Sequence, residues 1–185
     1  MLAYVFWHWR QPSIDETDYE NRQRAFHRAL AAAPSPGFQR SLSHALRGAP
    51  WAADGGDAYE DWYLMVDSAS LDPLNSAAIS ASRRAPHDAA AAAAAGGTAG
   101  IYSLRQGAPL DRPGFAAWFG KPAGMPYEEL FESLSPATGQ GAALWMRYMV
   151  LGPSPEFCLQ SVGAPSLPAE LGARVVPLRA VWPGE

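Results

Sequence analysis

Cysteine is almost missing from this sequence of 185 residues, and its scarcity excludes whole classes of site. Cys158 is the only cysteine. One cysteine cannot close an intramolecular disulfide or build a cysteine-rich zinc site. We therefore expect a reducing compartment, the cytoplasm, and no zinc or other metal. Cys158 itself is predicted to be a small packed core residue, since the sequence places no histidine beside it.

Positive charge and long apolar runs are also scarce. The formal net charge is -4, and lysine and arginine form no cluster. We therefore expect neither nucleic acid nor an anionic membrane surface as a partner. The apolar run at residues 1–9 is too short to cross a membrane and lacks the features of a secretory signal, so it predicts a buried strand.

Aromatic residues are plentiful, with seven each of Trp, Tyr and Phe, and 48% of all residues are hydrophobic. This composition excludes intrinsic disorder and fits one globular domain, or two small domains that share a core. No glycine-rich phosphate loop, zinc-protease helix or nucleophile elbow is present, so motifs alone assign no chemistry.

The first 106 residues alternate between strand and helix patterns. Ser13 to Glu16 has the form of a capping box that would begin the first helix, and Pro86 is expected to break the later helical region between residues 82 and 87. Gly96 and Gly97 are expected to form a turn. The predicted elements are a strand at 4–9, a helix at 15–33, a hairpin of strands at 38–46 and 59–66, helices within 71–95, and a strand at 101–105.

The same order of elements returns after a linker at residues 107–114. It comprises a strand at 115–120, a helix from residue 126, strands at 142–151 and 156–162, a short helix at 167–171 and a strand at 174–182. Local echoes support a duplication, since the segment from Trp7 to Pro12 parallels the segment from Trp118 to Pro122.

This element order resembles the dimeric α+β barrel superfamily, in its version with two ferredoxin-like repeats in one chain. The resemblance implies an α+β fold with β-α-β-β-α-β repeats at 1–106 and 115–185, whose antiparallel sheets pack as a barrel around a pocket. Its members include small-molecule monooxygenases, isomerases and haem-binding chlorite dismutase-like proteins. The haem proteins place their axial histidine in the second repeat, which has no histidine here, so we expect no haem and no other cofactor. The sequence leaves a homodimer open.

Alternation within the strands predicts which side chains face that pocket. Trp62, Leu64 and Val66 form an apolar set that is expected to pack beneath helices. Their neighbours Asp61 and Tyr63 would then face the pocket. By the same rule Trp145 and Arg147 share a face, as do Tyr4 and His8.

His8 and Asp61 are the catalytic candidates. His8 lies among aromatic residues, where its pKa could suit acid–base work, although a core histidine bonded to backbone explains the same pattern. Either Asp61 or Glu60 must point inward, and the alternatives are an ion pair with Arg147 or a strand end in water. His27, on the first helix, is expected to be solvated.

Six further residues are binding candidates. Tyr4, Tyr63 and Trp145 would line the pocket, and Arg147 would hold an anionic oxygen. Arg84 and His87 lie where a helix is expected to begin and could bind a carboxylate or phosphate. The alternative there is a solvated kink with Asp88 as helix cap.

Two functional hypotheses follow. The first is a small-molecule-binding protein or cofactor-independent enzyme with a pocket between two sheet faces. The second is a non-catalytic interaction or structural protein whose sheet faces are filled by side chains. A cavity larger than roughly 300 Å³ would favour the first.

Overall fold

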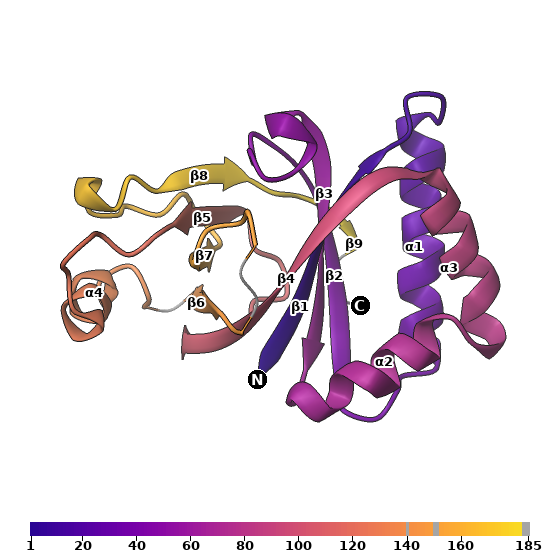
Figure 1. The fold of residues 1–185 in the computed structure, drawn as a ribbon, viewed down its shortest axis with the longest axis horizontal. Coiled ribbons are helices and arrows are strands. Elements are labelled where there is room, and N and C mark those ends of the chain that lie inside the picture. The colour runs from indigo at the N-terminus through magenta and orange to yellow at the C-terminus, as the bar shows by residue number, and fades with distance from the viewer. Residues whose placement is uncertain (140, 150–151, 183–185) are drawn as a thin grey trace.

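The computed structural model describes residues 1–139, 141–149 and 152–182. They form a mixed α+β fold in which one antiparallel sheet is partly covered by helices (Figure 1). The strands are β1 (Leu2–Arg10), β2 (Phe38–Arg47), β3 (Asp57–Met65), β4 (Ala94–Gly107), β5 (Phe115–Phe119), β6 (Ala142–Arg147), β7 (Phe157–Ser161), β8 (Arg174–Pro177) and β9 (Arg179–Trp182). The helices are α1 (Glu16–Ala32), α2 (Leu71–Ala78), α3 (Ala81–Ala93) and α4 (Tyr127–Leu134), with short 3-10 turns at Ala53–Gly55, Ser68–Ser70 and Ala169–Leu171.

The nine strands of the described residues follow the order β8-β5-β7-β6-β4-β1-β3-β2-β9. The predicted final strand is two strands that are separated at Leu178, whose backbone N–H donates to the carbonyl of Gly114 at 2.8 Å. Its two parts pair with opposite ends of the sheet, β8 with β5 and β9 with β2. The sheet is therefore nearly closed. A 3-10 turn stands where the second half was predicted to have its last helix, and the repeat boundaries stay a prediction.

The N-cap of the first helix lies two residues later than predicted. Asp15, and not Ser13, is the N-cap, and its carboxylate accepts the backbone N–H of Asp18 at 2.8 Å. Asp15 serves because its backbone is extended and its side chain reaches the free amides of the first turn. The buried face of α1 then contains the expected residues Tyr19, Phe26 and Leu30.

The helical break was predicted too late in the chain. It lies at Ile79 and Ser80, and Pro86 sits inside α3. A proline inside a helix removes one backbone hydrogen bond, which α3 tolerates. The break is instead fixed by Arg83, whose guanidinium donates to the carbonyl of Ala77 and to that of Ala33. Arg83 thus ties the ends of α1 and α2 together.

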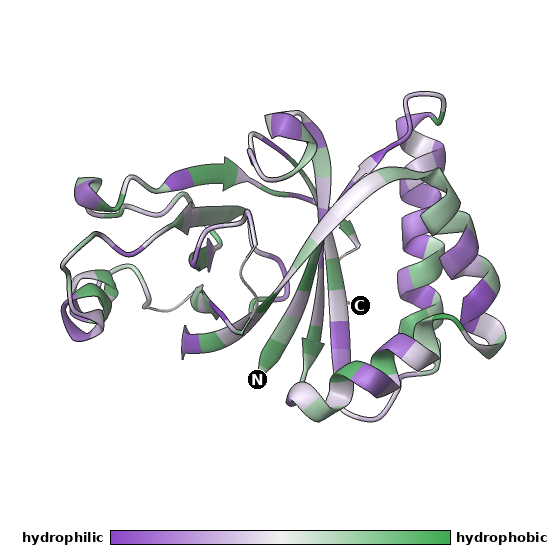
Figure 2. Cartoon of the chain, in the orientation of Figure 1, coloured by the Kyte–Doolittle hydropathy of each residue, from purple (hydrophilic) through white to green (hydrophobic). Residues whose placement is uncertain are grey.

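Gly96 and Gly97 belong to β4 and do not form the predicted turn. A Cβ at Gly96 would lie 2.6 Å from the Trp9 ring, and one at Gly97 would lie 2.5 Å from the Phe6 ring. Glycine is needed here because aromatic rings of β1 lie against the backbone of β4. Figure 2 shows that helices α1 to α3 carry both hydrophilic and hydrophobic residues, as expected for helices with one side on a sheet.

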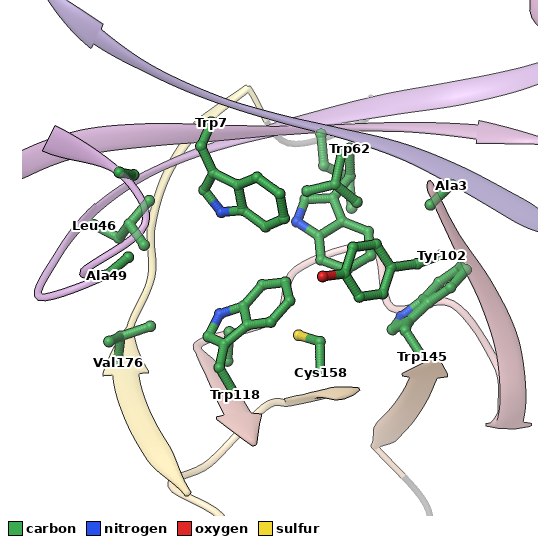
Figure 3. Packing of buried hydrophobic residues seen from close by; sticks show 14 of the residues in the cluster. Ala3, Trp7, Leu46, Ala49, Trp62, Tyr102, Trp118, Trp145, Cys158 and Val176 are labelled. Atoms are coloured by element: carbon green, nitrogen blue, oxygen red, sulfur yellow. The ribbon is translucent and has the colours of Figure 1, made fainter. Parts of the chain in front are cut away.

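The apolar faces of β1 and β3 point into the nearly closed sheet and not toward helices. Trp62 and Leu64 are buried there, whereas Val66 is 52% exposed. Figure 3 shows rings from both halves of the chain meeting in this interior. We call them the tryptophan core, which consists of Trp7, Trp62, Tyr102, Trp118 and Trp145. Because these rings fill the space, the pocket predicted between two sheet faces is wrong. The helices cover the opposite face instead.

Candidate active site

A pocket of about 630 Å³ lies between the first-half strands and helices α1 to α3. This volume is within the usual range for small-molecule sites. Most of its wall is apolar or aromatic. The described lining residues are Tyr4, Phe6, His8, Gln23, Phe26, Leu30, Asp61, Tyr63, Leu71, Asp72, Leu74, Asn75, Ala78, His87, Ala90, Ala91, Ala94, Ala95 and Gly96.

Strand register brings the polar residues of this pocket together. In the antiparallel pair of β1 and β3, Tyr4 lies opposite Tyr63 and Phe6 opposite Asp61. Side chains directly opposite each other share a face of the sheet. His8 follows two residues after Phe6 and therefore points to the same side. The predicted grouping of Tyr4, His8, Asp61 and Tyr63 thus exists, on the helix side of the sheet.

Asp61 is the centre of the polar cluster. Its Oδ2 atom lies 3.2 Å from Nε2 of His8 and 3.3 Å from Nε2 of His27, and it accepts the hydroxyl of Tyr63 at 2.9 Å. Both imidazole nitrogens lie against Oδ2 without forming a hydrogen bond to it. Oδ1 of Asp61 has no hydrogen-bond partner among the described residues. One carboxylate oxygen of Asp61 is therefore buried without a hydrogen-bond partner in the described part of the chain.

The surroundings of Asp61 favour its charged form. Burial alone would raise the pKa of this carboxyl, because desolvation penalises charge. The imidazoles of His8 and His27, which lie against Oδ2, outweigh burial by electrostatic attraction and hold the pKa of Asp61 well below its ordinary value. In turn, burial and the nearby Asp61 raise the pKa of Tyr63, so its phenol keeps its proton.

His8 connects the pocket to a second buried phenol. Its Nδ1 atom lies 2.5 Å from the hydroxyl of Tyr19, and its ring stacks on Phe6 and Tyr59. Burial, with the charge of Asp61, raises the pKa of Tyr19. A hydroxyl that stays protonated can donate to an imidazole nitrogen and fix its tautomer.

His27 was predicted to be solvated, and this was wrong. It is fully buried, with Nδ1 2.7 Å from the Ser41 hydroxyl and Nε2 against Asp61. The signal was present in the sequence. Glu20, Gln23 and His27 are spaced by three and four residues beside the apolar stripe of α1, and all three are buried.

Glu60 points to the other side of the sheet from Asp61. Its two carboxyl oxygens accept the indole N–H groups of Trp7, at 3.3 Å, and Trp62, at 2.9 Å. Burial raises the pKa of Glu60 to about 7, despite those hydrogen bonds. Cys158 is buried in the same interior, and burial followed by the charge of Glu60 raises the pKa of its thiol. It is packed, as predicted.

Three binding candidates lie outside the pocket. Trp145 is in the tryptophan core and donates to Gln160 at 3.1 Å. Arg147 donates to the backbone carbonyls of Gly152 and Ser154, at 3.3 and 2.6 Å, so it neither pairs with Asp61 nor faces the pocket. They are separated from His8 because β6 belongs to the other half of the sheet. Arg84 is exposed and lies 3.8 Å from Asp88.

His87 does line the pocket, but not at the start of a helix. It lies within α3, with its ring edge against Phe26 at 5.4 Å between centroids, and its Nδ1 is 3.0 Å from Asp88. Asp88 is likewise inside α3 and not its cap. The predicted anion site at a helix start is therefore absent, because α3 begins at Ala81.

Within residues 1–139, 141–149 and 152–182, no group of three or more His, Cys, Asp or Glu is arranged to hold a metal ion. No helix in the described part of the chain is both long and apolar enough to cross a membrane. In the pocket wall, histidines are the only side chains that can carry positive charge, since no Lys or Arg is among the described lining residues.

No family model matches the chain, and no curated protein matches it in sequence. Solved structures do match in fold. A candidate monooxygenase from Fusobacterium nucleatum subsp. nucleatum has a TM-score of 0.66 at 9% identity, covering 98% of this chain and 92% of the other. A candidate monooxygenase from Lactobacillus acidophilus has a TM-score of 0.59 at 9% identity, covering 98% and 94%. An anthrone oxidase-like protein has a TM-score of 0.53 at 11% identity, covering 100% and 94%. At such identities the likeness establishes the fold alone, and the chain has the α+β barrel fold of these structures.

Proposed function

We propose that this protein is an enzyme that binds a small, neutral, largely aromatic molecule beneath helices α1 to α3 and removes a proton from it. The observation that carries the proposal is Asp61. It is 1% exposed, lines the pocket, keeps Oδ1 free of protein partners and touches His8. A buried charged group that stays unpaired is costly, so a carboxylate oxygen left free in a pocket favours a ligand that donates to it.

The substrate class follows from the pocket wall. Aromatic and aliphatic side chains supply most of the lining, and no Lys or Arg is present to balance an anion among the described lining residues. A phenol, or a ketone with an acidic C–H group, would place its proton against Asp61 and His8 while its rings contact Tyr4, Phe6 and Phe26. Proton transfer by positioned side chains accelerates such reactions by about 10²- to 10⁴-fold.

Anthrone is a suitable probe, since one solved structure with the same fold is an anthrone oxidase-like protein. Its central methylene is weakly acidic because the anion is delocalised over the rings and the carbonyl. The anion can react with oxygen, so that one anthrone and one O₂ give one anthraquinone and one water. Proton removal is the step we assign to this pocket.

The test is hydrogen exchange at the anthrone methylene in D₂O without oxygen, followed by NMR. We expect the protein to accelerate exchange over buffer, and His8→Gln and Asp61→Asn to lower the acceleration at least about 100-fold. Arg84→Gln, which changes an exposed residue outside the pocket, should retain the full rate. Equal rates for all four proteins would contradict the proposal. Oxygen uptake on adding air then shows whether oxidation follows.

A second candidate function is a non-catalytic binding or interaction protein. It is favoured by His8, whose two ring nitrogens already face Tyr19 and Asp61 inside the protein. The filled tryptophan core is also consistent with it, since that interior holds side chains and not a ligand. In this case anthrone or a naphthol would quench or shift the intrinsic fluorescence on binding, yet exchange would stay at the buffer rate.

A further inference from the structure

The cluster around Asp61 contains more ionisable groups than a single acid–base pair needs. His27 touches the same carboxylate oxygen as His8 but does not line the pocket. A buried carboxylate requires a positive partner to remain charged. The contacts of the two imidazoles indicate which of them carries that positive charge.

We propose that His27 is the resting positive charge of the site, a protonated imidazole that neutralises Asp61 and leaves His8, on the pocket side, neutral. The inference rests on the proposed function for its catalytic meaning. Its charge assignment rests on the contacts of His27 alone. His27 is thus a positioning residue that acts through Asp61.

The contacts of His27 suit a cation. Each ring N–H of a protonated His27 would face an oxygen that can accept a hydrogen bond, Ser41 Oγ at 2.7 Å and Asp61 Oδ2 at 3.3 Å. Its two faces lie against aromatic rings, Tyr63 at 5.6 Å and 18° and Trp182 at 6.2 Å and 15°. Aromatic faces attract positive charge. Ser41 offers an aliphatic hydroxyl oxygen, which is a good acceptor.

The contacts of His8 suit a neutral ring. Its Nδ1 faces the Tyr19 phenol, whose oxygen shares its lone pair with the ring and therefore donates better than it accepts. Burial and the charge of Asp61 keep that phenol protonated by raising its pKa. A neutral His8 would accept from Tyr19 at Nδ1 and carry its own hydrogen on Nε2, toward Asp61.

The remaining groups around His27 agree with one positive charge. From β3 it is faced by Asp61 and Tyr63, and β9 contributes Trp182. From β2 it is faced by Ser41 and is close to His44, whose pKa falls to about 4 through burial, despite Asp61 and with a further lowering from His27. His44 therefore stays neutral, so the charge is not duplicated.

The experiment is an NMR measurement of ring protonation in the full chain with ¹⁵N-labelled histidine, without ligand, at pH 7.5. The signals of His8, His27, His44 and His87 are assigned with single Gln variants. We expect both nitrogens of His27 to be protonated and one nitrogen of His8 to be protonated. A neutral His27, or a doubly protonated His8, would overturn the inference. In Asp61→Asn, if it folds, His27 should become neutral; a retained charge there would overturn it too.

The catalytic consequence has its own readout, the pH profile of anthrone exchange. Without His27, Asp61 loses one of the two imidazoles that hold its pKa below the ordinary value, so the pKa of Asp61 should rise. In His27→Gln the acid limb should therefore move to higher pH. His44→Gln, which removes a buried imidazole that does not contact Asp61, should leave the limb in place. An unmoved limb in His27→Gln contradicts the positioning role. If the unmodified protein shows no exchange, the proposed function fails, while the NMR result still decides where the charge lies.

Discussion

Glu60 and Asp61 adjoin in β3 but meet opposite environments. Asp61 faces two imidazoles, which hold its pKa well below the ordinary value against the effect of burial. Glu60 faces the tryptophan core, where burial raises its pKa to about 7 and only indole N–H groups oppose the shift. Because strand neighbours point to opposite faces, one residue step changes the sign of the shift.

Glu60 is expected to make stability depend on pH between about 4.5 and 7. In that window the folded protein keeps the Glu60 proton while the unfolded chain, with the ordinary value of 4.5, releases it. Its stabilising contribution is therefore full below pH 4.5 and is lost as the pH rises to 7. Glu60→Gln cannot titrate. Its stability relative to the unmodified protein should rise by on the order of 3 kcal/mol from pH 4.5 to pH 8.

Urea unfolding of both proteins at several pH values measures this difference, and the other titrating groups cancel in the comparison. At low pH the variant should be the less stable of the two, since the amide nitrogen of glutamine cannot accept an indole N–H. If the free energies of unfolding of the two proteins changed in parallel with pH, the pKa of Glu60 in the folded protein would not be raised, and the prediction would be wrong.

Among the elements, β4 is the one whose packing against β1 requires glycine. Gly97→Ala should destabilise the protein by about 1 to 3 kcal/mol, because the new methyl group would lie 2.5 Å from Phe6 ring carbons and 2.9 Å from the Trp7 carbonyl oxygen. Phe6 lines the pocket, so its displacement should also weaken ligand binding. Gly120→Ala is the matched control, since nothing lies within 4 Å of a Cβ there. Thermal unfolding measures the difference, and equal Tm values for the two variants would contradict the prediction.

The sequence predicted the type of each element better than it predicted which neighbours each strand face packs against. Alternation correctly grouped Tyr4 with His8, and Asp61 with Tyr63, because side-chain period is a local property of a strand. It could not show which group faces the helices. That choice depends on the volume inside the nearly closed sheet, which indole rings such as Trp62 and Trp118 fill. The sequence-based rule that apolar stripes lie beneath helices was therefore wrong here.

The difference between local pattern and tertiary packing also explains which predicted site residues meet in the pocket. Candidates from β1 and β3 meet in the pocket because these strands are hydrogen-bonded neighbours. Trp145 and Arg147 required knowledge of how β6 is placed relative to β1, which strand patterns do not contain. His27 could have been found from its spacing to Gln23 on α1. Gly97 could not, since a glycine pair that supports close packing reads as a turn in the sequence.

On the scale of the whole molecule, the tryptophan core joins the two halves of the chain. Trp118 from β5 lies between Trp7 and Trp62 from the first half, with ring centroids 5.3 and 6.1 Å away. A core shared in this way couples the unfolding of both halves.

Trp118→Ala should cost about 3 to 5 kcal/mol and lower the stability of both halves together. Hydrogen exchange read by mass spectrometry can follow peptides from residues 1–106 and 115–182 separately. Both sets should lose protection at one denaturant concentration, in the variant and in the unmodified protein. A first half that stays protected after the second has opened would show two independent units.

The last strand segment has a consequence for biosynthesis. Residues 174–182 contribute the strand beside β5 and the strand beside β2, and they follow the other strands of the described residues. While the ribosome is still adding them, β2 and β5 each present an unpaired backbone edge to neighbouring nascent chains. Completion of this segment replaces both edges with strands of four residues. The interval before it emerges is therefore the period in which a chaperone would have most to protect.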